Sequence, residues 1–66
     1  MLNKMSSSSL QYIGKSNKKF TYKNLYRYCS FHLENFYISI YANNRQLVVI
    51  RDPYYFTINF KEVTEE

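Results

Sequence analysis

Residues 21–34 of this chain read TYKNLYRYCSFHLE, and the fold depends on whether this stretch is a helix or a strand. At the turn of about 100° per residue in an α-helix, large and apolar side chains gather on one side and small polar or charged ones on the other. A strand would mix polar and apolar side chains on both of its faces. The periodicity therefore predicts a helix over about 21–34. Its apolar side would hold Tyr22, Leu25, Tyr28, Cys29, His32 and Leu33.

The residues at the two ends agree with that helix. Thr21 can serve as its N-cap, since a hydroxyl oxygen can accept a hydrogen bond from the first turn. Asn35 tolerates the left-handed conformation found just after a helix, and Phe36 behind it supplies a hydrophobic closure. The helix propensity of the stretch is only middling, because it is rich in Tyr, Ser, Cys and Asn. A strand therefore stays open as the alternative.

Two runs rich in β-branched and aromatic residues follow, FYISIYA at 36–42 and QLVVIR at 46–51. Asn43-Asn44 lies between them, and Asn tolerates the positive φ that a two-residue type I′ turn requires. This pattern predicts a β-hairpin with a two-residue turn. The face that meets the helix would then hold Ile38, Ile40, Leu47 and Val49, and the outer face would hold Tyr37, Tyr41, Val48 and Ile50.

A third alternating segment, at 55–61, follows Asp52-Pro53. Pro53 suits the second position of a type I turn, which would place Phe56 and Ile58 on the face covered by the helix. The predicted fold is therefore α+β, with one helix at about 21–34 packed on a three-stranded antiparallel meander. Its strands are expected at about 36–42, 46–51 and 55–61, and residues 10–13 could add a short N-terminal edge strand.

The length sets the number of domains. A chain of 66 residues has room for one core, because so small a domain buries only about 60% of the surface that its unfolded chain exposes. One α+β domain is expected to span 10–63. Residues 1–9 contain a four-serine run and no periodic apolar pattern, which is typical of a disordered tail. Residues 64–66 are expected to form a frayed acidic tail.

The composition narrows the class of protein. No apolar run approaches the length of a membrane span, and the N-terminus lacks the hydrophobic region of a signal peptide, so we expect a cytoplasmic protein without membrane contact. Cys29 is the only cysteine, which excludes an internal disulfide and fits a reducing compartment. Enrichment in Asn, Lys, Tyr, Ile and Phe is typical of AT-rich coding sequence, as in a phage or another mobile element.

Catalytic chemistry has little support in the sequence. His32 is the only histidine and, like Cys29, it falls on the apolar side of the predicted helix, where a place in the core is the simpler interpretation. No Ser-His-Asp or Cys-His arrangement can be assembled, and a single glycine does not make a glycine-rich phosphate loop. We therefore expect a protein that is not an enzyme and has no metal site and no cofactor.

The basic residues are concentrated in the first half of the chain. Residues 1–33 carry six lysines and arginines and no acid, whereas 34–66 is net acidic. Between 15 and 27 the cations alternate with aromatic rings, a mixture in which cations meet phosphates while rings stack on bases. The sequence thus predicts a small nucleic-acid-binding domain. The expected contacts are Lys15, Lys18, Lys19, Lys23 and Arg27 for phosphates, and Tyr37, Tyr41 and Tyr55 for bases.

The outer face of the predicted sheet supports a different function. It holds large apolar and tyrosine side chains that no remaining segment covers, and such a patch is typical of a protein interface. The alternative is a protein-binding modulator, such as a small inhibitor or adaptor of the phage or plasmid type, that uses this face or an edge strand. A homodimer that buries the same face also suits so small a core. The interface would hold Tyr37, Tyr41, Val48, Ile50 and Tyr55.

Overall fold

The computed structural model describes residues 9–63 and contains five strands and one short helix. In chain order the elements are β1 (Ser9–Tyr12), β2 (Leu25–His32), β3 (Tyr37–Tyr41), β4 (Leu47–Ile50), α1 (Pro53–Asn59) and β5 (Phe60–Val63). The α+β class predicted from the sequence is confirmed, although the sheet has more strands than expected. The predicted tails at 1–9 and 64–66 lie outside the described residues, except that Ser9 belongs to β1.

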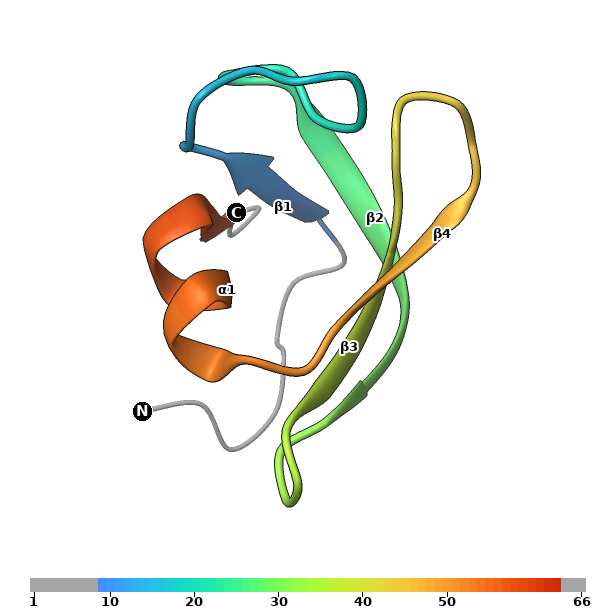
Figure 1. Ribbon diagram of the computed structural model, residues 1–66, viewed down its shortest axis with the longest axis vertical. Helices are drawn as coiled ribbons and strands as arrows, with labels where there is room; N and C mark the ends of the chain where they lie inside the picture. Colours follow the sequence, from blue (N-terminus) through green and yellow to red (C-terminus); the bar gives the residue numbers. More distant parts are fainter. Residues whose placement is uncertain (1–8, 64–66) are drawn as a thin grey trace.

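The strands form one antiparallel sheet in the order β4-β3-β2-β1-β5. β2 joins the two halves of this sheet, because residues 25–27 pair with β1 and residues 28–32 pair with β3. In Figure 1 the half with β1 and α1 lies opposite the half with β3 and β4. The hydrophobic core lies between the halves and consists of Leu10, Tyr12, Phe20, Tyr26, Ile38, Ile40, Ala42, Ile50, Phe56 and Phe60.

The helix predicted over 21–34 is wrong, because residues 25–32 form β2. Tyr26 and Tyr28 pack on the core, and the next side chain of the strand to do so is Phe31, three residues later instead of two. A β-bulge between Tyr28 and Ser30 causes this change of phase, since one extra residue turns the following side chains to the other face. Because the phase changes inside the strand, alternation did not fit the whole stretch, and the helical period fitted it better.

The β-hairpin predicted around Asn43-Asn44 is confirmed, but its register differs by one residue. The backbone N–H of Ala42 donates to the Gln46 carbonyl at 2.9 Å, which leaves a three-residue loop. The last residue of this loop, Arg45, has a φ of 67°. A three-residue loop that ends in the left-handed conformation is a common alternative to the two-residue turn.

The shift of register reverses the two faces of β4. Val48 and Ile50, predicted on the outer face, turn toward the core, and Ile50 is buried. Leu47 and Val49, predicted in the core, are 46% and 45% exposed. One extra residue in a turn has this effect because side chains along a strand alternate between its faces.

The segment predicted as a third strand at 55–61 is a helix followed by a strand. Asp52 is the N-cap of α1, its carboxylate accepting a backbone N–H of the first turn at 3.0 Å, and Pro53 begins the helix. An Asp-Pro pair is a signal for a helix start as well as for a turn. Phe56 of α1 is buried in the core, and β5 begins at Phe60 and pairs with β1. The N-terminal strand therefore lies between β2 and β5, not at the predicted edge.

Candidate functional site

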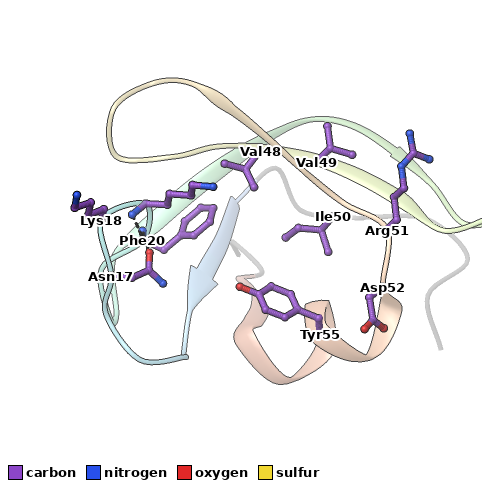
Figure 2. Close-up of a pocket in the computed structure, with 10 residues that line it drawn as sticks. Asn17, Lys18, Phe20, Val48, Val49, Ile50, Arg51, Asp52 and Tyr55 are labelled. Carbon is purple, nitrogen blue, oxygen red and sulfur yellow. Dashed lines mark hydrogen bonds between the residues drawn. The ribbon is translucent and has the colours of Figure 1, made fainter.

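A pocket of about 480 Å³ opens between the loop before β2, strand β4 and helix α1 (Figure 2). Phe20, Val48 and Ile50 supply apolar side chains to it, and Figure 2 shows Tyr55 pointing into the space from α1. Tyr55 is 40% exposed, so its ring is accessible to a ligand. This pocket, called the cleft below, is lined by Asn17, Lys18, Lys19, Phe20, Val48, Val49, Ile50, Arg51, Asp52 and Tyr55.

The loop that carries Lys18 and Lys19 is held by its own hydrogen bonds. The side-chain oxygen of Asn17 accepts the backbone N–H groups of Lys19 at 2.8 Å and of Phe20 at 2.9 Å, an arrangement that Asn favours in turns. The Asn17 amide also donates to the hydroxyl of buried Tyr12 at 3.2 Å. Both lysines are exposed, so their charged groups are in water while their backbone is fixed.

Tyr12 connects this loop to the core. Its hydroxyl donates to the Lys15 carbonyl at 2.8 Å, and its ring stacks on Phe20 with 5.3 Å between the centroids. Burial raises the pKa of Tyr12 above its ordinary value of 10.0, and the nearby Tyr55 raises this pKa further. The hydroxyl therefore keeps its proton near neutral pH and remains a donor to the loop.

The turn between β3 and β4 is fastened to the same loop through Asn43. Its backbone N–H donates to the Lys19 carbonyl at 2.8 Å, and its side-chain amide donates to the Lys18 carbonyl at 3.3 Å and the Thr21 hydroxyl at 3.2 Å. The hydroxyl of buried Tyr26 donates to the Asn43 side-chain oxygen at 2.7 Å and accepts the Thr21 N–H at 2.6 Å. A single amide side chain thus joins the lysine loop, the hairpin turn and the core.

β4 borders the cleft with its open edge. The strand stands at one end of the sheet, and four consecutive residues, 48–51, line the cleft. Because successive side chains point to opposite faces, a pocket lined by consecutive residues borders the edge of the strand. Ala42 and Gln46 form a hydrogen-bonded pair, and along two antiparallel strands hydrogen-bonded pairs alternate with pairs that are not hydrogen-bonded. Val49 falls in a pair of the second kind, so its N–H and C=O point away from β3. The cleft therefore offers a backbone donor and acceptor beside its apolar side chains.

The charged groups around the cleft are mainly basic. Lys18 and Lys19 belong to the loop. Arg51 and Asp52 follow β4 at the start of α1 (Figure 2). The Asp52 carboxylate is the N-cap of α1 and is the one acid among the lining residues that the structure describes. The Arg51 guanidinium lies 5.0 Å from the centroid of the Tyr37 ring. The two lysines are therefore the cations that an anionic ligand would meet at the rim of the cleft, since the Arg51 guanidinium lies over Tyr37 and points away from the pocket.

The structure brings together part of the predicted nucleic-acid set. Lys18, Lys19 and Tyr55 line the cleft, and Lys15 is exposed in the same loop. Lys23 lies apart from them, in a turn at 21–24, with a φ of 75° and its ammonium 5.6 Å from a neighbouring tyrosine ring.

The other predicted residues lie outside the cleft. Arg27 and Tyr41 line a second groove across β2 and β3, and Tyr37 lies beside the end of β2, where its ring is 5.6 Å from that of His32. Tyr37 and Tyr41 are thus on the outer face of the sheet. The expectation that all three tyrosines share one base-stacking surface is wrong, because Tyr55 belongs to α1 and not to a strand.

The predicted protein interface is also not one surface. Val48 and Ile50 contribute to the core side of β4, whereas Tyr41 lies on the outer face. Large apolar side chains that do share this outer face are Tyr41, Leu47 and Val49, which are 43%, 46% and 45% exposed.

The sequence indicates Phe20 only as one of the rings that alternate with the cations between 15 and 27, and it does not select Asn17 or Arg51 for the site. Asn17 carried a signal, because Asn two residues before a backbone N–H often closes a turn with its own side chain. Arg51 carried none, since its neighbours in space come from other elements.

Possible catalytic and metal-binding groups are placed differently from the prediction. His32 and Cys29, expected in the core, are both exposed. Within residues 9–63 no three His, Cys, Asp or Glu side chains are grouped so that they could hold a metal ion. In the same part of the chain no helix is long and apolar enough to cross a membrane.

Comparison with protein-family models, with curated proteins and with solved structures found no match to this chain.

Proposed function

We propose that this protein is a non-catalytic domain that binds single-stranded nucleic acid in the cleft. One observation carries the proposal: an apolar pocket with an exposed tyrosine ring has two lysines on a fixed loop at its rim. An unpaired base would enter the pocket, and the adjoining phosphates would meet Lys18 and Lys19.

The pocket suits a flat aromatic ligand. Its volume of about 480 Å³ falls in the range of small-ligand sites, which is about 300 to 1,000 Å³. Tyr55 offers a ring on which a base can stack, and such stacking tolerates any base because every base has a π-face. Val48 and Ile50 provide an apolar surface for the rest of the ring.

The same features favour a single strand over a duplex. Bases in a duplex are stacked and paired, so their faces are hidden, whereas an unpaired base can be turned out and stacked on a protein ring. The backbone N–H and C=O of Val49 at the edge of β4 would then be available to the polar edge of that base.

The rigid loop supports phosphate binding. The bonds from Asn17 and Asn43 fix the backbone at Lys18 and Lys19 before a ligand arrives, so less conformational freedom is lost on binding. The two lysines would contribute about −1.4 to the slope of log affinity against log salt, at about −0.7 per contact for a single strand.

The test is fluorescence anisotropy with labelled single-stranded and duplex oligonucleotides over a series of salt concentrations. Lys18→Glu should weaken single-strand binding by about tenfold or more, which is about 1.4 kcal/mol. Lys61→Glu is the matched control, because Lys61 is exposed on β5 and does not line the cleft. Equal losses in the two variants, or affinity that does not depend on salt, would contradict the proposal.

A protein partner is the second candidate, favoured by the exposed Tyr41, Leu47 and Val49 on the outer face. A modulator of this kind would lose binding when Tyr41 and Leu47 are changed to serine and would keep it when Lys18 is reversed in charge. The same pair of variants in a sedimentation experiment tests whether the partner is a second copy of this chain.

A further inference from the structure

A second groove of about 530 Å³ lies across β2, β3 and the turn that follows β3. Arg27 comes to it from β2 and Arg45 from the turn, and both are exposed. Tyr41 lies between the two elements that carry them. Among residues 9–63 no acidic side chain lines this groove. It therefore attracts anions and offers two guanidinium groups, whose planar donors match the oxygens of a phosphate.

The groove is joined to the cleft by one hydrogen-bonded junction. Asn43 lines the groove, and its amide and backbone N–H bond to the carbonyls of Lys18 and Lys19 in the cleft loop. Arg45 follows two residues later, with a φ of 67° that fixes the end of the turn. The lysines of the cleft and Arg45 of the groove are therefore carried by segments that bond directly to each other.

We infer that the groove is a second phosphate-binding site for the strand whose base occupies the cleft. The strand would pass from Lys18 and Lys19 over the Asn43 junction, and its next phosphates would meet Arg45 and then Arg27. This inference rests on the proposed function and adds to it the path that the nucleic acid follows over the surface. Stacking at Tyr55 and phosphate binding at the arginines are then two separate parts of one interface.

The two parts differ in their dependence on length. The linings of the cleft and the groove share no residue, so a mononucleotide that fills the cleft would leave the groove empty, whereas a twelve-nucleotide strand would occupy both. For the longer strand the two arginines would add about −1.4 to the salt slope, at about −0.7 per phosphate contact.

The experiment measures the affinity and salt slope of dT12 for the wild-type chain, Arg27→Gln with Arg45→Gln, and Arg27→Lys with Arg45→Lys. The double glutamine variant should bind dT12 about tenfold more weakly, with a slope smaller by about 1.4. The double lysine variant should keep the slope and regain only part of the affinity, because lysine lacks the fork of donors. Lys61→Gln, which removes an exposed cation outside both pockets, should change neither quantity by as much.

The outcomes separate this inference from the proposed function. If the double glutamine variant binds dT12 like the wild type while Lys18→Glu weakens it, the groove is not part of the interface and the cleft proposal stands. If the wild-type chain binds no single strand at low salt, both proposals are overturned. A dispersed amide spectrum for each variant shows that the fold is intact, as expected for exposed positions.

Discussion

The cleft and the outer face of the sheet are built from the two sides of the same strand. Along β4, Val48 and Ile50 turn toward the core and line the cleft, while Leu47 and Val49 present apolar side chains outward. Both regions also hold an exposed tyrosine, Tyr55 in one and Tyr41 in the other. They differ in how firmly they are held and in the elements that carry their cations. The loop before β2 carries those of the cleft, and β2 with the turn after β3 carries those of the outer face.

The difference indicates what distinguishes a candidate site from exposed apolar side chains alone. The cleft is concave, has cations at its rim, and its loop is bonded to the core through Tyr12 and Asn43. On the outer face Tyr41 lies beside Cys29, and a hydrogen bond between these two side chains raises the Tyr41 pKa. The cleft therefore carries the stronger argument for a ligand, although both faces expose tyrosine.

The largest difference is expected in stability. Phe20 is buried and its ring is 5.0 to 5.3 Å from those of Tyr12, Tyr26 and Phe60. Phe20→Ala should cost about 3 to 5 kcal/mol of unfolding free energy, which approaches the whole stability of a domain of this size. Leu47→Ala on the outer face should cost less than about 1 kcal/mol. Urea unfolding measures both, and similar losses would show that the outer face is covered in solution.

The next difference concerns the junction between loop and turn. Asn43→Ala removes the acceptor of the buried Tyr26 hydroxyl and two donated hydrogen bonds. We expect a loss of about 1 to 3 kcal/mol in unfolding free energy. Asn24→Ala is the control, since its side chain makes no hydrogen bond within residues 9–63. An Asn43→Ala variant as stable as this control would mean that the junction does not hold the loop.

A comparable effect is expected on binding when the two tyrosines are exchanged for alanine. Tyr55→Ala should weaken binding of a short single strand by about 1 to 3 kcal/mol, which is the contribution of one stacked base. Tyr55→Phe should keep this affinity because the ring is retained. Tyr41→Ala should leave it unchanged, and anisotropy with a trinucleotide distinguishes the three variants. If Tyr41→Ala were the only variant to lose affinity, the binding site would lie on the outer face and not in the cleft.

The smallest effect is expected from alkaline pH. Burial raises the pKa of Tyr12 in the folded chain above the ordinary value of 10.0. The unfolded chain therefore releases this proton first, and the stability that is present below pH 10 is lost as the pH rises from there to the folded-state pKa. Urea unfolding between pH 9 and about pH 11 should show the decline, and Tyr12→Phe should make it shallower. If the stability of Tyr12→Phe declined as steeply as that of the wild type, groups other than Tyr12 would be the cause of the decline.

The class of fold and the position of one hairpin could be predicted from the sequence. The runs on both sides of Asn43-Asn44 have the alternation and β-branched content of paired strands. Their register could not be predicted, because the loop has three residues and its left-handed position is held by Arg45 and not by glycine. A difference of one residue in the turn exchanged the core face and the outer face of β4.

The predictions for the segments that form β2 and α1 were wrong for a different reason. The bulge near Cys29 changes the phase of β2, so neither a period of two nor a clear amphipathic strand was visible. The Asp52-Pro53 pair starts turns and helices alike, and only the packing of Phe56 into the core decides for the helix.

The candidate site was predicted in part for the same reason. Lys18, Lys19 and Tyr55 were each recognised by residue type, because cations bind phosphates and aromatic rings stack on bases. That they surround one pocket depends on α1 returning the chain to the lysine loop. Arg45 and Arg51 belong to the acidic half of the sequence, where charge counting gave no reason to select them.

The most direct test of the central claim is a ¹⁵N HSQC titration of the wild-type chain with a short single-stranded oligonucleotide at low and moderate salt. We predict shifts at residues 17–20, at 48–51 and at Tyr55 that weaken as the salt concentration rises, with a weaker response to a duplex. Shifts confined to the outer face around Tyr37 and Tyr41, or no shifts at low salt, would contradict this prediction.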